Sequence, residues 1–186
     1  MPLSVLDLYI LSLIDRGLST KYELQRQGGV SLGSSSPALA RLVSANFVRQ
    51  QAAGADGQRS RHDLTLTALG RRTVRKDWRM LLTQRSVTDL DSILRTADIA
   101  AHYGADHNQV SEYLLAMAST RKSEAMRTTK PRLGQAASSV ALELQLGWNA
   151  IRVRAEARYL TLVAARFMPG HAGTRTAAAR ISRKDD

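Results

Sequence analysis

The sequence predicts a mainly α-helical protein with a single β-hairpin in its first half. Over most of the chain apolar residues recur three and four positions apart, the spacing that places them on one face of a helix. Two short runs, residues 47–51 and 59–66, look extended instead, and they flank the small, glycine-containing segment 52–58. With 186 residues, 44% of them hydrophobic, the chain is large and apolar enough to bury a core.

The first two predicted helices are bounded by residues that favour helix ends. Ser4 opens a helix with one apolar stripe, and Gly17 follows it where a C-terminal cap is expected. Thr20 and Glu23 have the spacing of a capping box for a second helix, which ends at Gly28. The apolar stripe of the first helix consists of Leu6, Tyr9, Ile10, Leu13 and Ile14.

A third helix is predicted where serines precede a proline. We expect Ser34 to be its N-cap and the helix to begin at about Ser35, with Pro37 in the first turn, where its missing N–H is not needed. The predicted buried stripe consists of Leu39, Leu42 and Val43. The predicted outer face consists of Ser35, Ala38 and Arg41. This face is small, polar and basic enough to approach phosphates and base edges, although a serine-rich helix start alone more often indicates only a cap.

The two extended runs predict a β-hairpin around the segment 52–58. In its second strand only Leu64 and Leu66 alternate with polar residues, so the hairpin should be held by packing on the helices rather than by its own pattern. Three helices followed by a basic hairpin is the order of a winged helix-turn-helix. In that fold the third helix enters the DNA major groove, and we expect the hairpin to lie along the adjacent backbone.

Four short segments carry a resemblance to a known family. They are Tyr22-Glu23-Leu24, Pro37-Ala38-Leu39-Ala40-Arg41-Leu42, Phe47-Val48 and Leu66-Thr67-Ala68-Leu69-Gly70. In this order, within residues 4–80, they resemble the landmarks of PadR-like transcriptional regulators. Ser36 stands where that family commonly has a tyrosine, and Leu64 where it usually has an aromatic residue. The resemblance implies a winged-helix DNA-binding domain joined to a helical dimerisation domain.

A fourth helix should follow the hairpin and carry a strongly basic surface. It begins at Thr67 or Ala68, and its apolar residues are Leu69, Val74 and Trp78. Two interpretations of the charge are equally supported, namely the solvated face of a linker helix and a direct contact with phosphates. The basic residues are Arg71, Arg72, Arg75, Lys76 and Arg79.

The second half should be entirely helical. Ser86 can cap a helix that runs to about His102, and Asp106 can cap the next one. Their apolar stripes are Leu90, Ile93, Leu94 and Ala97 in the first helix, and Val110, Leu114 and Met117 in the second. After a break at residues 130–134, a long helix is predicted from about Gln135 to Phe167.

The long helix carries two apolar stripes. The first consists of Val140, Leu144, Trp148, Ile151, Ala155, Tyr159 and Leu162. The second consists of Leu142, Leu146, Val153, Ala157, Leu160 and Ala164. One stripe can be covered by the same chain, but a second contiguous stripe seldom faces water in a monomer. We therefore expect a homodimer, as the resemblance also implies, with Val140, Leu144, Trp148, Ile151, Tyr159 and Leu162 at the interface.

The expected organisation is a winged-helix DNA-binding domain at residues 1–82, a helical dimerisation domain at 83–168 and a disordered basic tail at 169–186. Trp148 has two interpretations. As a tryptophan on an apolar stripe it is more often core, while some PadR-like regulators have an aromatic wall in a small-molecule effector pocket between dimer helices.

Charge and composition restrict the function. A net charge of +11 indicates a polyanionic partner, with double-stranded DNA the first candidate. The chain has neither an 18-residue apolar run nor a basic segment before its apolar N-terminal stretch, so we expect a cytoplasmic protein without a membrane span. With no cysteine, four scattered histidines and no hydrolase, nucleotide-hydrolase or dinucleotide motif, we expect no metal, no cofactor and no enzyme activity.

These observations predict a sequence-specific, double-stranded DNA-binding transcriptional regulator, most simply a repressor, that acts as a homodimer on an operator with two half-sites. The alternative is a winged-helix protein-interaction or assembly module that binds an acidic partner, because fold alone does not decide function. The residues expected to contact DNA are Lys21, Tyr22, Ser34, Ser35, Ser36, Arg41, Arg59 and Arg61.

Overall fold

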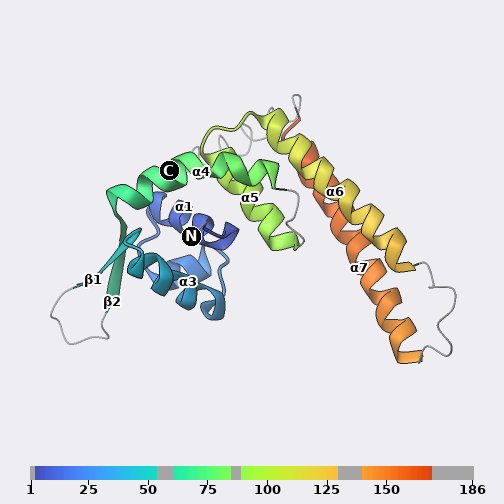
Figure 1. The fold of residues 1–186 in the computed structure, drawn as a ribbon, viewed down its shortest axis with the longest axis horizontal. Coiled ribbons are helices and arrows are strands. Elements are labelled where there is room, and N and C mark those ends of the chain that lie inside the picture. Colours follow the sequence, from blue (N-terminus) through green and yellow to red (C-terminus); the bar gives the residue numbers. More distant parts are fainter. Residues whose placement is uncertain (1–2, 54–60, 85–88, 130–139, 169–186) are drawn as a thin grey trace, which may run out of the picture. The chain divides into compact units, whose positions relative to one another are not determined.

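The computed structural model of the protein describes residues 3–53, 61–84, 89–129 and 140–168. They fall into two compact units, residues 1–103 and 104–186, which are described separately below. The first unit contains α1 (Val5–Asp15), α2 (Lys21–Arg26), α3 (Leu32–Ser44), β1 (Val48–Ala53), β2 (Arg61–Leu66), α4 (Ala68–Thr83) and α5 (Leu90–His102) (Figure 1). The second contains α6 (His107–Thr129) and α7 (Val140–Ala165). The fold is mainly helical with one antiparallel hairpin, which confirms the predicted fold class.

The N-terminal caps of α1 and α2 are those that the sequence predicts. Ser4 accepts a hydrogen bond from the backbone N–H of Asp7 at 3.1 Å, and the Asp7 carboxylate accepts one from the backbone N–H of Ser4. Thr20 and Glu23 form the same reciprocal pair at the start of α2. These bonds satisfy N–H groups that the first turn of a helix leaves without partners. Gly17, just after α1, has the left-handed φ of 98° that the expected cap requires.

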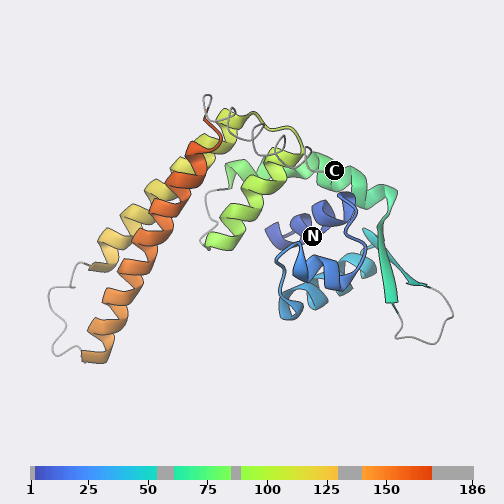
Figure 2. The ribbon, with the colours of Figure 1, turned by 180° about the vertical axis from the view of Figure 1, so that it is seen from behind.

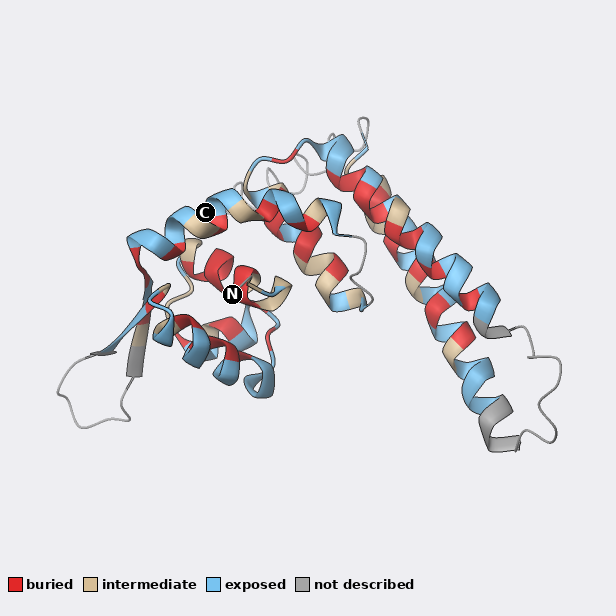
Figure 3. Ribbon diagram, viewed as in Figure 1, coloured by how far each residue is buried: buried red, intermediate tan, exposed pale blue. Residues whose placement is uncertain are grey.

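Helix α3 begins one turn earlier than expected, and this corrects the prediction for its faces. Ser31, not Ser34, is the N-cap, and Pro37 lies inside the helix. Ser35, Ala38, Leu39 and Leu42 are spaced i, i+3, i+4 and i+7, which places them on one side of the helix, and all four are buried. Ser35 is fully buried, with its hydroxyl donating to the carbonyl of Leu32, so it is not on the outer face as predicted. Figure 3 shows the buried side of α3 turned towards the rest of this unit.

The hairpin is antiparallel, with Val48 opposite Leu66 and Ala53 opposite Arg61. Leu64 and Leu66 are buried against the helices, as the sparse alternation in this strand predicts. The hairpin is joined to α4 by Thr67, whose hydroxyl donates to the carbonyls of Asn46 and Phe47. Thr67 also caps α4 by accepting from the N–H of Gly70, so one side chain fixes the end of the third helix, the hairpin and the start of the fourth helix.

Helix α1 lies at the centre of the first unit and packs on α3, α4 and α5 (Figure 2). The buried side of α4 consists of Gly70, Val74, Trp78 and Leu81, whereas Leu69 is exposed, contrary to the predicted stripe. Helix α5 is capped by Asp89, whose carboxylate accepts from the N–H of Ser92 at 2.7 Å. Ser86, the expected cap, lies outside the described residues. Because α5 packs on α1 and α4, it belongs to the first unit, and the division of the structure lies about twenty residues after the expected boundary at 82.

The second unit is an antiparallel pair of long helices, α6 and α7, which lie side by side in Figures 1 and 2. Asp106 caps α6 as expected, accepting from the N–H of Asn108. The predicted stripe of α6, Val110, Leu114 and Met117, is buried. It faces the second predicted stripe of α7, in which Val153, Ala157, Leu160 and Ala164 are buried and Leu146 is exposed. Among the described residues no helix combines the length and apolarity needed to cross a membrane.

Candidate nucleic-acid interface

The exposed face of α3 is built from small side chains. The side opposite the buried stripe consists of Gly33, Ser34, Ser36, Pro37, Ala40, Arg41 and Ser44. A Cβ placed on Gly33 would meet no atom within 4 Å, so this face is open to solvent along the first turns of the helix. Its serine hydroxyls can donate to and accept from base edges or phosphates, and its short side chains let the helix backbone come close to a ligand.

Arg41 lies at the edge of this face and is held by a buried carboxylate. Its Nη2 atom donates to Oδ1 of Asp7 at 2.9 Å, and the Asp7 side chain is 8% exposed. The other oxygen of Asp7 accepts from the backbone and the hydroxyl of Ser4, so the carboxylate is fully used. The Arg41 side chain itself is 59% exposed. Because a guanidinium carries five N–H donors, Arg41 can keep this ion pair and still offer donors to a ligand.

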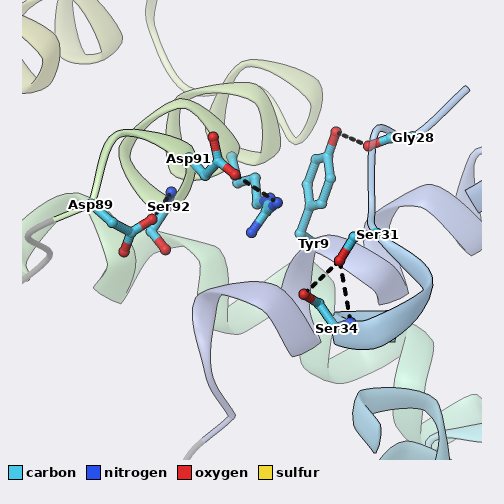
Figure 4. Close-up of polar contacts among 8 residues, drawn as sticks. Tyr9, Gly28, Ser31, Ser34, Asp89, Asp91 and Ser92 are labelled. Atoms are coloured by element: carbon cyan, nitrogen blue, oxygen red, sulfur yellow. Dashed lines mark hydrogen bonds and ion pairs between the residues drawn. The ribbon is translucent and has the colours of Figure 1, made fainter. Parts of the chain in front are cut away.

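The segment before α3 is positioned by hydrogen bonds that Figure 4 shows. The hydroxyl of Tyr9 donates to the carbonyl of Gly28 at 3.1 Å, which ties the end of α2 to α1. Ser31 and Ser34 hydrogen-bond through their hydroxyls at 2.8 Å, and Ser31 also accepts from the N–H of Ser34. Ser34 is exposed but shares its hydroxyl with Ser31, so its availability to DNA is less than that of Ser36.

Helix α2 contributes two of the predicted residues and one that the sequence analysis missed. Lys21 and Tyr22 are exposed, as expected. Arg26 lies one turn after Tyr22, donates to its hydroxyl and places its guanidinium 5.8 Å from the centre of its ring. The signal for this pair was the i, i+4 spacing of a tyrosine and an arginine on a short helix. Arg26, Lys21 and Tyr22 therefore place two cations and one aromatic ring beside α3.

The hairpin is anchored to the helices at its base. The N–H of Leu64 donates to the carbonyl of Ser19 at 2.6 Å, and Leu64 is buried. Arg49, on the opposite strand, is exposed. Arg61 is the first residue of β2 and pairs with Ala53, but its side chain is not among those described. Arg59 lies outside the described residues, so the structure leaves both predicted wing contacts untested.

The structure thus presents Lys21, Tyr22, Ser34, Ser36 and Arg41 on two consecutive, contacting helices and removes Ser35 from the set. The residues that the structure describes contain no group of three or more histidine or acidic side chains able to hold a metal ion. The site consists of hydroxyl, guanidinium and ammonium donors. Its chemistry is the binding of hydrogen-bond acceptors and negative charge.

Comparisons with known proteins give similar solved structures but no matching family. No family model matches the chain, and no curated protein matches it. The fold is similar to the crystal structure of Bacillus subtilis PadR in complex with operator DNA, with a TM-score of 0.38 and 18% sequence identity. That alignment covers 89% of this chain and 99% of the PadR chain.

Proposed function

We propose that the chain is a sequence-specific, double-stranded DNA-binding transcriptional regulator of the PadR-like type, and that it represses transcription. The observation that carries this proposal is the exposed face of α3, where hydroxyls and small side chains are flanked by Arg41 and by the exposed residues of α2. In a winged helix this face meets base edges in the major groove, and serine and arginine are residue types that can read them. Arg59 and Arg61 supply the wing contacts in this proposal.

The proposed regulator acts as a homodimer joined through α7. Val153, Ala157, Leu160 and Ala164 of the second apolar stripe of α7 are buried on α6, but the first stripe is exposed: Leu144 is 70% exposed, Trp148 66%, Ile151 58%, Tyr159 49% and Leu162 68%. Val140, the remaining predicted interface residue, begins α7, and its side chain is not described. The exposed stripe spans the nineteen residues from Leu144 to Leu162, or about 27 Å of helix. A contiguous apolar surface of this length favours a second copy as the partner that covers it.

Selection of bound duplexes from a random pool tests the proposal. We expect enrichment of two related half-sites whose centres lie about 10 base pairs, or a multiple of this, apart. Binding of the selected duplex should weaken steeply with salt, since each neutralised phosphate contributes about 0.9 to the slope of log affinity against log salt. Placing the selected site across a promoter should then lower reporter output. A pool that shows no enrichment after repeated rounds would reject sequence-specific recognition and favour the protein-interaction alternative.

A further inference from the structure

Helix α4 carries the densest positive surface in the described part of the chain. Its exposed residues line a shallow groove formed by Ala68, Arg71, Arg72, Arg75, Lys76 and Arg79. The groove therefore contains five cationic side chains and a single methyl group. Asp77, the only acidic residue of α4, is half-buried on the flank of the helix and does not line the groove.

Only part of this charge is neutralised within the unit. Asp15 of α1 faces two of the arginines, with one oxygen 3.9 Å from Nε of Arg71 and the other 3.7 Å from Nε of Arg75. Arg72 and Lys76 form no ion pair with an acidic side chain of the described residues, and Arg79 stacks over Trp78 at 4.8 Å from the ring centre. Of the five cations, two thus lie near a carboxylate of the described residues, an arrangement that favours binding of an external anion.

This surface is turned away from the exposed face of α3. Helix α1 packs on both α3 and α4, and Figure 1 shows it between them. The buried side of α3 and the buried side of α4 both point towards this core, so their exposed sides point in opposite directions. A duplex that lies on α3 therefore does not reach the groove on α4.

The residue types that line the groove indicate which class of partner it binds. A lipid surface would need a contiguous apolar face to insert, but the apolar side of α4, with Val74 and Trp78, is buried in the protein, and the exposed Leu69 and Met80 lie eleven residues apart. An acidic protein partner would be expected to find clustered apolar or aromatic anchors, but among the lining residues only Ala68 is apolar, and the exposed Leu69 and Met80 lie outside the lining. Arginine forks match phosphate oxygens, and the row from Arg72 to Arg79 spans about 10 Å along the helix. A sugar-phosphate backbone needs only such a row of cations.

We infer that the exposed groove of α4 is a second, sequence-independent binding surface for the phosphate backbone of double-stranded DNA. It is separate from the α3 face and goes beyond the proposed function, because it lets one subunit hold a second segment of duplex while α3 occupies the first. Arg72, Lys76 and Arg79 supply positive charge that no acidic side chain of the described residues neutralises. Arg71 and Arg75 supply further donors from exposed guanidinium groups that lie beside Asp15.

Photo-crosslinking tests this inference, because the chain contains no cysteine and a single introduced thiol can be labelled uniquely. Ala68→Cys places the label in the groove of α4, and Ala40→Cys places it on the exposed face of α3. Each labelled protein is irradiated with a random-sequence duplex of about 20 base pairs, two helical turns. We expect crosslinks from both positions. Adding Arg72→Ala, Lys76→Ala and Arg79→Ala should reduce the crosslink at position 68 to background and leave that at position 40 unchanged.

A charge-matched control separates a local site from bulk charge. Lys122→Ala, Arg127→Ala and Arg166→Ala remove three exposed cations from the second unit and should preserve the crosslink at position 68. An equal loss with both triple variants, or no loss with either, would overturn the inference. So would protection of position 68 by polyglutamate at the same charge concentration as the duplex, since that result fits an acidic protein.

The two labels also distinguish this inference from the proposed function. A crosslink at position 68 without one at position 40 would support the α4 surface and reject DNA binding by α3. A crosslink at position 40 alone would reject the α4 surface and leave the proposed function intact.

Discussion

At the residue scale, Arg41 joins the stability of the fold to the proposed recognition of DNA. Its partner Asp7 is buried, is part of the capping box of α1 and accepts hydrogen bonds at both oxygens. A buried carboxylate without a cation is costly, so Arg41 has a structural reason to be present whether or not it touches DNA. Any test of Arg41 must therefore measure folding and binding separately.

Arg41→Ala should weaken binding to the selected duplex by roughly 1–3 kcal/mol if the guanidinium reads a base. It should also lower the free energy of unfolding by about 1 kcal/mol, because the exposed end of this ion pair is screened by water. Fluorescence anisotropy and urea unfolding measure the two effects. Unchanged affinity together with unchanged base preference would leave Arg41 with only its role beside Asp7.

At Gly70 the addition of a single methyl group should lower the stability of the protein markedly. A Cβ built there lies 2.2 Å from the carbonyl oxygen of Phe47, which is backbone and cannot rotate away. Gly70→Ala should therefore destabilise the protein by about 1–3 kcal/mol, as overpacking does. Gly147→Ala is the matched control, since a Cβ there meets nothing within 4 Å and alanine favours a helix by about 1 kcal/mol. Urea unfolding should move the two variants in opposite directions, and a stable Gly70→Ala protein would refute the contact.

The raised pKa of Tyr103 predicts how the stability of the protein depends on pH in the alkaline range. Burial, and secondarily the charge and hydrogen bond of Asp15, raise the pKa of the Tyr103 hydroxyl to about 12. A raised folded-state pKa gives stability that is complete below the unfolded value of 10.0 and is lost as the pH rises towards about 12. Tyr103→Phe removes this ionisation, so its unfolding free energy should fall less steeply over that interval than that of the wild type. Parallel urea curves at both ends of the interval measure the difference, and equal slopes would contradict it.

At the element scale, predictions held where a local signal had one solution and failed where it had several. Ser4, Thr20 and Asp106 were each the evident cap, and the structure confirms them. Ahead of α3, four serines within six residues all satisfied the capping rule, so residue type alone did not identify Ser31 as the cap. Ser35 is buried because it lies four and seven residues before Leu39 and Leu42, on the same side of the helix, and this changes one residue of the candidate site.

The spacing of residues in the sequence could not predict contacts between distant elements. Arg121 of α6 and Glu156 of α7 lie 3.1 Å apart and are almost fully buried, yet nothing in the sequence pairs them. Asp7 with Arg41, and Asp15 with Arg71 and Arg75, are likewise ion pairs across helices. Such pairs depend on how helices cross, which apolar periodicity leaves open.

We expect the two arginines of the wing to contact phosphates. Arg59→Ala combined with Arg61→Ala should weaken binding to the selected duplex and to random duplex alike, because wing contacts to phosphates carry no base information. The slope of log affinity against log salt should become shallower by about one unit for each lost contact. Anisotropy titrations between roughly 50 and 200 mM salt measure both quantities. A loss confined to the selected duplex would instead assign these arginines to base recognition.

At the scale of the whole molecule, α5 was the element that sequence could not place. Its apolar stripe predicted a helix correctly, but a stripe does not name the surface that covers it. In the structure Ile93 and Ala97 are buried in the first unit, and Arg16 of α1 forms an ion pair with Asp98 at 2.8 Å. The first unit is therefore larger than a minimal winged helix. In the described residues the second unit consists of the α6 and α7 pair.

Dimerisation through α7 is the prediction on which the proposed two-half-site binding depends. Leu144→Asp places a charge on a residue that is 70% exposed in one chain, so the variant should fold normally and yet be unable to bury this position against a second copy. Gln145→Asp is the matched control, because the neighbouring residue is exposed and lies outside the stripe. Circular dichroism should show equal helix content, while sedimentation should show a monomer only for Leu144→Asp.

The binding of these two variants tests what the dimer contributes to affinity. Two joined heads, with recognition helices about 34 Å apart or a multiple of that, gain roughly 10²- to 10⁴-fold over one head through effective concentration. We therefore expect Leu144→Asp to lose most of its affinity for a duplex with two half-sites and to keep its affinity for one half-site. A folded monomer that binds the full site as tightly as the wild type would refute the model. So would a wild type that sediments as a monomer at micromolar concentration, because the exposed stripe of α7 would then need another partner.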